Sequence, residues 1–293
     1  MSYQPFLDSY LQSLVRNEKT IRTKKFLMKH LETFGWRNIW DFQTVKEFYE
    51  YLESKGLKPS TIKETIREVK AFLRFLKDSG VQVMLDERAF KKLWDYKKLK
   101  AKKRKEVFSD QELDRFFAYC DKKPPIYKVF FLLLLHSGLR VNEALSLLPE
   151  DLKVKKLGDK EVLFLSVREG KFSKQREVPM VMLSEEEKNF FKRFFLGRKG
   201  KPLWSYLLKY PKSVKEKILN YWAVVKFCQM AEKELGFSVY PHKFRYTWIS
   251  KMLAMGFSPH AVAQWAGHEK VQTTLETYAV VLTEHEIMKL WNP

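Results

Sequence analysis

Several polar side chains in the second half of the chain have the types and spacing needed to act on a phosphate ester. His242 and Arg245 are three residues apart, so on a helix they lie on one face and can point at the same target. His268 and Tyr278 are ten residues apart and would face different directions in one continuous helix. We therefore expect a turn at Gly267 that separates two short helices and lets both side chains reach one site. This set is typical of a site for an anionic ligand and a phenolic nucleophile.

Cleavage of a phosphodiester without a metal requires three kinds of group: cations that stabilise the transition state, a general base and a general acid. The non-bridging oxygens gain charge in the transition state, and guanidinium groups suit them because they stay charged and bond two oxygens at once. Arg140 and Arg245 could supply these groups. A phenol has a pKa of about 10 and needs a base or a strongly positive site; His242 is the candidate base, and the two arginines would also favour the phenolate. The departing oxygen needs a general acid, and Lys171 on a predicted hairpin tip could deliver that proton.

Two further residues complete this hypothetical site. His268 could bond a phosphate oxygen, and Glu143, one turn after Arg140, would hold that arginine in place. Each residue alone is weak evidence, because single arginines, histidines and tyrosines usually serve solvation or packing. The prediction depends on the joint order of GLRxxEAL, a hairpin GKxxKxRxVP, HxxR, GH and a tyrosine ten residues later. The sequence lacks an acidic cluster suited to a metal-dependent nuclease, so neither metal nor cofactor is expected.

The overall charge indicates a polyanionic partner. Lysine and arginine number 55 against 35 acidic residues in a chain of 293, which gives a net charge of +20. Such an excess favours nucleic acid over the alternative of a merely basic protein. Cys120 and Cys228 are far apart and lie in no metal-ligand spacing, so we expect a reducing compartment, without disulfide or zinc. No apolar run or leader pattern predicts a membrane span or secretion, and a cytoplasmic protein is expected.

The first part of the chain, residues 1–96, is predicted to be helical. The segment from Ser60 to Gly80 has an apolar stripe at helical spacing, with Thr61 and Glu64 at a capping-box distance, and Thr20 to Gly35 follows a similar plan. Residues 97–107 form a basic linker. Exposed cations here are either solvated or in contact with DNA phosphates; the candidates are Arg22, Lys24, Lys25, Lys63, Arg67, Lys70, Lys102, Lys103 and Arg104.

Residues 108–293 are predicted to form a mixed domain, with a small antiparallel sheet on a helical body. Ser109 is the expected N-cap of its first helix, and a helix over 126–136 should end at Gly138. Strands are predicted over 162–165 and 177–181, with a polar hairpin tip over 168–174. Helices are predicted over 184–195 and 213–235, and a short amphipathic helix over 283–290.

These motifs resemble those of the tyrosine recombinases of the phage-integrase and Xer type, over nearly the whole chain. The matching segments are SGLRVNEALSL (137–147), GKFSKQREVP (170–179), His242–Arg245 and GHEKVQTTLETY (267–278). The resemblance implies a mainly α fold with a small antiparallel β-sheet: a helical, SAM-like core-binding domain and an α+β catalytic domain. It also implies a site in which Arg140, Lys171, His242, Arg245 and His268 surround the scissile phosphate, with Tyr278 as nucleophile.

The implied reaction joins Tyr278 to a DNA 3′-phosphate and releases a 5′-hydroxyl, and a second 5′-hydroxyl then reseals the strand without ATP or metal. The implied partners are double-stranded DNA with specific recombination sites and, on it, a tetramer of the same chain. The tail from Thr283 to Trp291 could dock on a neighbouring protomer or on its own body. Phe172 replaces the family's usual glycine, so Lys174 remains a rival to Lys171. Two rival interpretations of the chain are a type IB topoisomerase and a DNA-binding protein that lacks the chemistry.

Overall fold

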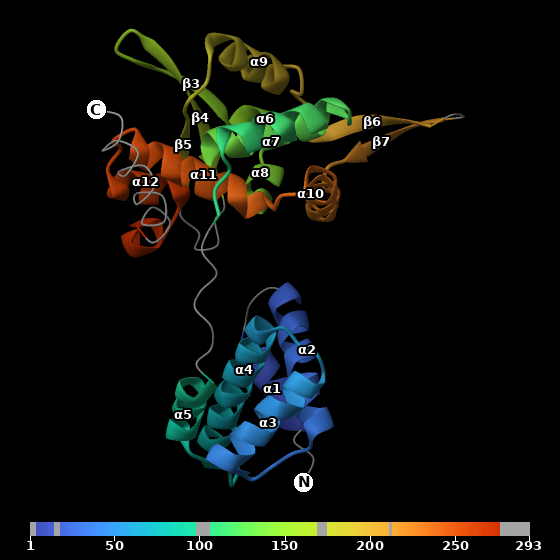
Figure 1. Cartoon of the computed structure of the whole chain (residues 1–293), viewed down its shortest axis with the longest axis vertical. Coiled ribbons are helices and arrows are strands. Elements are labelled where there is room, and N and C mark those ends of the chain that lie inside the picture. The colour runs from blue at the N-terminus through green and yellow to red at the C-terminus, as the bar shows by residue number, and fades with distance from the viewer. Residues whose placement is uncertain (1–3, 15–17, 98–105, 169–174, 211–212, 276–293) are drawn as a thin grey trace. The chain divides into compact units, whose positions relative to one another are not determined.

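The chain divides into two compact units, residues 1–102 and 103–293 (Figure 1). The computed structural model describes residues 4–14, 18–97, 106–168, 175–210 and 213–275. Tyr278, both hairpin lysines, the linker cations Lys102–Arg104 and the tail lie outside these residues.

The N-terminal unit consists of helices and one short pair of parallel strands. Its elements are α1 (Gln4–Ser13), α2 (Glu18–Phe34), β1 (Ile39–Trp40), α3 (Phe42–Ser54), α4 (Pro59–Asp78), β2 (Met84–Leu85) and α5 (Glu87–Lys97). Strand β1 pairs with β2 in parallel. The apolar stripe predicted on α4 is confirmed, since its members are 2% exposed or less: Ile62, Ile66, Val69, Leu73 and Leu76. They join one core with residues of the other helices of this unit.

Two local predictions for this unit are wrong. Helix α4 begins at Pro59 with Lys58 as N-cap, so Thr61 lies inside the helix and forms no capping box. Proline at the first helical position explains this earlier start, because its fixed φ suits a helix and its missing N–H would have had no partner there. The similar plan predicted for Thr20 to Gly35 holds only in part, since Leu27 and Leu31 are buried but Phe26 is 55% exposed.

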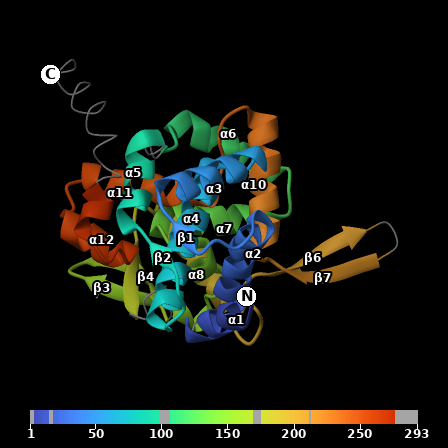
Figure 2. The same cartoon turned by 90° about the horizontal axis from the view of Figure 1, so that it is seen from below.

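The second unit contains a helical body, a three-stranded sheet and a separate hairpin (Figures 1 and 2). Its first elements are α6 (Asp110–Asp121), α7 (Pro125–Ser137), α8 (Val141–Leu145) and the 3₁₀ turn η1 (Pro149–Asp151). The strands β3 (Leu152–Leu157), β4 (Lys160–Val167) and β5 (Arg176–Met180) follow, and both of their pairings are antiparallel. The remaining elements are α9 (Glu185–Leu196), β6 (Ser205–Tyr210), β7 (Ser213–Ile218), α10 (Tyr221–Leu235), α11 (Pro241–Ala254) and α12 (Pro259–Ala266).

Most helix boundaries in this unit follow from local signals in the sequence. Ser109 caps α6, as predicted, and the structure adds a full capping box with Glu112. The predicted helix over 213–235 is wrong at its start, because residues 213–218 form β7 and pair with β6 in an antiparallel hairpin, and the helix α10 begins only at Tyr221. This hairpin projects from the body of the unit (Figure 2). Strand β3 was also missed in the sequence; it is one of the two outer strands of its sheet, and its alternation of apolar and polar residues lasts only from Leu152 to Lys155.

The core of the second unit is built around the pair α7 and α11. Trp248 of α11 and Phe130 and Phe131 of α7 are completely or almost completely buried and belong to a single apolar cluster. Helix α11 is buried over most of its surface, and its exposed residues, His242 and Ala254, lie at its two ends. Because this helix carries His242 and Arg245, a close-packed core determines where both side chains can point.

Candidate active site

Arg245 is the most deeply buried cation of the predicted site. It is 2% exposed, and its Nη1 donates to the carbonyl oxygen of Gly138 at 2.6 Å, while its Nη2 donates to that of Ala266. Burial, followed by the charge of Arg140, lowers the pKa of this guanidinium to about 9, so it is still protonated at pH 7. Two backbone carbonyls thus hold a buried positive charge between the end of α7 and the end of α12.

Gly138 makes this approach possible. Its φ of +60° ends α7 in the left-handed conformation, and a Cβ on it would lie 2.3 Å from the Trp248 ring. Only glycine satisfies both conditions without strain. Arg140 follows two residues later, so the close contact between α7 and α11 also determines the position of its backbone.

Arg140 is held by the carboxylate predicted to hold it. Its Nη1 donates to Glu143 Oε1 at 2.7 Å, and its backbone N–H donates to Glu143 Oε2 at 2.9 Å. Its Nη2 donates to the carbonyl of Gly267 at 2.9 Å. Glu143 is 5% exposed at its side chain. Burial alone would raise the pKa of this carboxyl, but hydrogen bonds and charges from Arg176 and Arg140 outweigh burial and lower it.

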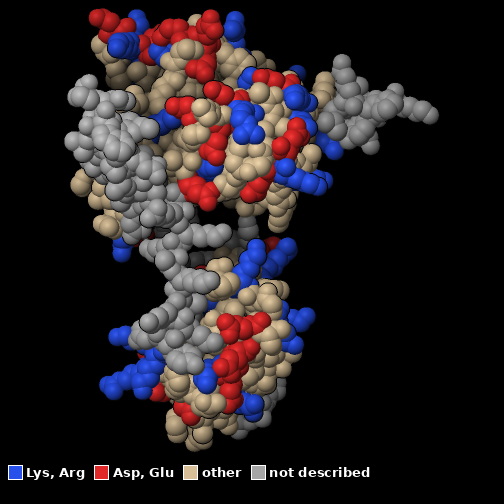
Figure 3. All heavy atoms as spheres, in the orientation of Figure 1, with Lys and Arg blue, Asp and Glu red and all other residues tan. Residues whose placement is uncertain are grey.

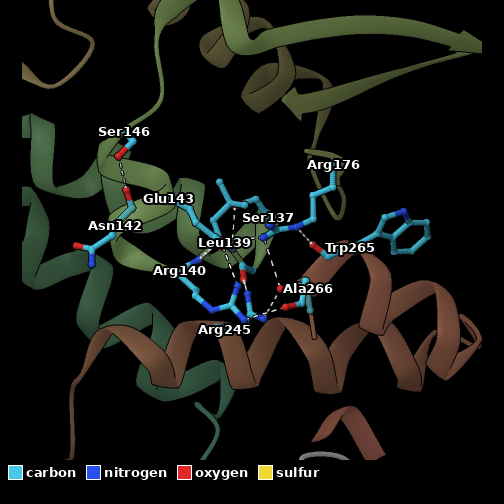
Figure 4. Close-up of polar contacts among 12 residues, drawn as sticks. Ser137, Leu139, Arg140, Asn142, Glu143, Ser146, Arg176, Arg245, Trp265 and Ala266 are labelled. Carbon is cyan, nitrogen blue, oxygen red and sulfur yellow. Dashed lines mark hydrogen bonds and ion pairs between the residues drawn. The ribbon is translucent and has the colours of Figure 1, made fainter. Parts of the chain in front are cut away.

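The end of α12 is the point where three arginines meet (Figure 4). The carbonyls of Trp265, Ala266 and Gly267 accept hydrogen bonds from Arg176, Arg245 and Arg140 respectively. The last carbonyls of a helix have no partner within it and carry partial negative charge, so guanidinium groups suit them. Here α12 provides the acceptors that assemble a cluster of cations from three other elements.

The turn predicted at Gly267 is confirmed. Its φ is +66°, and α12 ends at Ala266. His268 follows, with its Nδ1 2.7 Å from Thr274 Oγ1 in the helical turn over 271–275. The imidazole is therefore oriented by a buried hydroxyl beside the carbonyl that binds Arg140.

His242 lies on the first turn of α11 and is partly exposed to solvent. Partial burial, then the positive charges of Arg245 and Arg140, lowers its pKa. A lowered pKa favours the neutral imidazole, which is the state a general base requires. Its ring stacks against Tyr246, with centroids 5.9 Å apart.

Arg176, the first residue of β5, belongs to this cluster but was not assigned a role from the sequence. Its Nη2 donates to Glu143 Oε2 at 2.8 Å and its Nε to the carbonyl of Trp265 at 2.8 Å. The one sequence feature that could have identified it is its place as the arginine of the motif GKxxKxRxVP, in which only the two lysines were assigned a role.

The candidate DNA-contacting cations of the N-terminal unit fall into two groups. Lys24 and Lys70 are engaged within the unit: Lys24 Nζ lies 2.7 Å from Glu68 Oε1, and Lys70 Nζ lies 3.7 Å from Glu87 Oε2. The other four are exposed, and among them Arg22 and Arg67 form ion pairs within their own helices; the group is Arg22, Lys25, Lys63 and Arg67. On the face shown in Figure 3, acidic and basic side chains intermingle over both units.

Two features are absent from the described part of the chain. It contains no group of three or more His, Cys, Asp or Glu side chains that could hold a metal ion. Among the same residues, no helix combines the length and apolar character that crossing a membrane requires.

Comparison with known proteins decides the family. Residues 106–285 match the model of the phage integrase family. The chain belongs to this family. It is 36% identical to a probable integrase/recombinase of Aquifex aeolicus, over 96% of this chain and 97% of that protein. It is 27% identical to the tyrosine recombinase XerA of Pyrococcus horikoshii, over 82% of this chain and 90% of that one. These findings confirm the predicted recombinase enzyme.

Solved structures of recombinases confirm the fold class of this phage integrase family member. The Tn1549 transposon integrase, in complex with transposon right end DNA, matches with a TM-score of 0.71 at 18% identity, over 99% of both chains. A lambda integrase dimer bound to a COC′ core site matches with a TM-score of 0.71 at 15% identity, over 95% of both. The mainly helical fold with small antiparallel sheets is therefore the one predicted.

Proposed function

We propose that this recombinase cuts and rejoins specific sites in double-stranded DNA through a covalent bond to Tyr278. The observation that carries the proposal is the convergence of Arg140 and Arg245 at the end of α12, next to His268. With Arg176 and Glu143, three guanidinium groups and one carboxylate leave a net charge of +2. A preorganised cluster of this kind stabilises a phosphate that gains negative charge as it reacts.

In the proposed reaction the Tyr278 oxygen attacks the scissile phosphorus while neutral His242 accepts the phenolic proton. A phosphorus–oxygen bond to tyrosine forms, the bond to the 5′-oxygen breaks, and Lys171 or Lys174 protonates that oxygen. Arg140, Arg245 and His268 bind the non-bridging oxygens. A 5′-hydroxyl of a partner duplex then reverses these steps and releases the tyrosine. The phosphotyrosyl bond conserves the energy of the original ester, so the proposal requires neither ATP nor a metal.

The two units would share the DNA. We assign the N-terminal unit to DNA binding and the second unit to catalysis, with residues 97–107 as the basic connection between them. Solved structures support this, because the Tn1549 transposon integrase was solved in complex with transposon right end DNA and lambda integrase as a dimer bound to a COC′ core site. Assembly as a tetramer on paired sites in the cytoplasm, with the tail docked on a neighbouring copy, completes the proposal.

The decisive experiment uses a nicked target duplex in EDTA without nucleotide, followed by a denaturing gel. The wild-type chain should form a protein–DNA adduct, and Tyr278→Phe should form none while it retains binding. Tyr221→Phe, at an exposed position of α10, is the matched control and should behave as wild type. An undiminished adduct in Tyr278→Phe would place the nucleophile elsewhere. Relaxation of a plasmid without target sites would favour a type IB topoisomerase.

A second experiment tests the N-terminal unit with neighbouring lysines. Lys25 is exposed, and Lys25→Ala should lower the slope of log affinity against log salt by about 1, without change in stability. Lys24→Ala leaves Glu68, 10% exposed at its side chain, with the Tyr10 hydroxyl as its one remaining partner among the described residues, and should destabilise the unit by about 1–3 kcal/mol. Equal salt slopes for both variants and wild type would remove α2 from the DNA interface.

A further inference from the structure

Of the three arginines at the end of α12, Arg176 is the one to which the proposed reaction assigns no step. Its side chain is 10% exposed, and it is the first residue of β5. Arg140, by comparison, is 25% exposed at its side chain and has more access to a bound phosphate. Burial alone does not distinguish Arg176 from Arg245, which is 2% exposed, but the contacts of Arg176 show which groups of the protein it acts on.

The guanidinium of Arg176 joins two parts of the site that are far apart in the sequence. On one side its Nη2 donates to Glu143 Oε2 at 2.8 Å, across 33 positions in the chain. On the other side its Nε donates to the carbonyl of Trp265 at 2.8 Å, across 89 positions. The Nη2 also lies 3.5 Å from the carbonyl oxygen of Ala266. Figure 4 shows this bridge between α8 and the end of α12.

Gly267 lets this bridge close. A Cβ on Gly267 would lie 2.8 Å from Arg176 Cζ and about as close to two of its nitrogens. The guanidinium plane therefore packs directly on the backbone that leads into His268. This contact gives the glycine of the GH motif a second reason, besides its left-handed φ, to lack a side chain.

We propose that Arg176 is a positioning residue for the recombination site. It holds the Glu143 carboxylate and the last carbonyls of α12 at a fixed separation, and thereby sets where Arg140 and His268 meet the phosphate. The rigid fork of an arginine can donate in two directions at once, which the single ammonium of a lysine cannot reproduce. This inference rests on the proposed function, because it concerns the same reaction.

The test compares Arg176→Lys and Arg176→Gln with wild type in single-turnover cleavage of the nicked duplex. Lysine keeps the charge but not the fork, and glutamine keeps one donor but not the charge, so two independent variants probe the same bridge. A shift of about 1 Å in a catalytic group can cost on the order of 10²-fold in rate. We expect cleavage to slow by about 10- to 100-fold in both variants, with unchanged DNA affinity at matched salt and a folded circular-dichroism spectrum.

A substrate with a 5′-bridging sulfur distinguishes positioning from proton delivery, since a thiolate leaves without a proton. If Arg176 positions the phosphate-binding groups, the sulfur substrate should not restore the rate. Lys153→Ala, which removes an exposed cation from the same sheet, is the control and should cleave at the wild-type rate. A normal rate in both Arg176 variants, full rescue by sulfur, or a parallel loss of DNA affinity would each overturn the inference.

Non-additivity provides a readout that general destabilisation would not produce. Because Arg176 acts through Glu143, the rate loss in Arg176→Lys combined with Glu143→Gln should be smaller than the product of the single losses. Multiplicative losses would contradict a shared bridge. An absent adduct in the wild-type chain would instead refute the proposed function, so the two failures are distinguishable.

Discussion

Removal of the Glu143 carboxylate should destabilise the second unit by several kcal/mol. This side chain is 5% exposed and accepts three hydrogen bonds, from the Arg140 guanidinium at 2.7 Å, the Arg140 backbone N–H at 2.9 Å and Arg176 at 2.8 Å. Glu143→Ala deletes both acceptor oxygens and with them all three hydrogen bonds. Two guanidinium groups would then face each other without a counter-charge, and Arg245 contributes a third positive charge nearby.

The burial of each partner sets the size of the effect. Loss of one partner from a buried ion pair costs about 3–5 kcal/mol. Arg140 is a quarter exposed at its side chain, so solvent screens part of its charge, whereas Arg176 is only 10% exposed. We therefore expect a loss near the lower limit, about 3 kcal/mol, for Glu143→Ala. Glu143→Gln keeps an acceptor of the same shape and should lose about 1–2 kcal/mol.

Urea unfolding at pH 7 measures the difference, with a separate transition fitted for each unit. Glu177→Ala is the matched control, because this carboxylate also lies on β5 but forms its ion pairs with Lys153 and Lys155 at the surface. Its loss should cost less than about 1 kcal/mol. If Glu143→Ala were no more harmful than Glu177→Ala, the carboxylate would not be what stabilises the arginine cluster.

The pH dependence gives an independent check on the same carboxylate. Its pKa is lowered in the folded chain, so its contribution to stability is complete above the unfolded-state value of about 4.3 and is lost as the pH falls toward the lower folded-state value. Glutamine does not titrate. The stability difference between wild type and Glu143→Gln should therefore narrow as the pH is lowered below about 4.3, and a constant difference would contradict the lowered pKa.

Two further predictions concern the same site. Gly138→Ala should destabilise the second unit by more than about 3 kcal/mol, because its Cβ would meet the Trp248 ring at 2.3 Å, whereas Gly158→Ala, with a similar φ and open space, should cost only about 1 kcal/mol in urea unfolding. An imidazole NMR titration should give His242 a pKa below 6.5 that rises in Arg140→Gln, because that charge helps to lower it; an unmoved titration midpoint in Arg140→Gln would contradict this cause.

The parts of the fold that could be predicted from the sequence were those with local causes. The capping box at Ser109, the left-handed end of α7 at Gly138 and the turn at Gly267 each depend on residues within one helical turn of one another. The contact between Arg140 and Glu143 spans three positions and was predicted for the same reason. Such signals survive without knowledge of tertiary structure, because helix geometry alone brings the residues together.

Features that depend on partners far away in the chain could not be predicted from the sequence. Residues 213–218 were predicted as helix, but they form a strand because they pair with residues 205–210 in a hairpin. Their own sequence has neither a helical nor a strand period clear enough to decide between the two. In the sequence, Lys24 cannot be distinguished from its exposed neighbour Lys25. In the fold, its ammonium contacts Glu68, which lies 44 positions away. Arg176 stood inside a matched motif, but its partners lie 33 and 89 positions away. Sequence spacing cannot reveal any of these contacts.

Long-range contacts also explain how the three arginines of the site can lie close together in the absence of DNA. Three guanidinium groups this close repel one another, and burial removes the water that would otherwise solvate them. The carbonyls at the end of α12 and the Glu143 carboxylate replace that water with fixed acceptors, and each arginine is drawn from a different segment of the chain. The tertiary fold therefore holds these cations in place in advance, and a phosphate that binds beside them need not first assemble them.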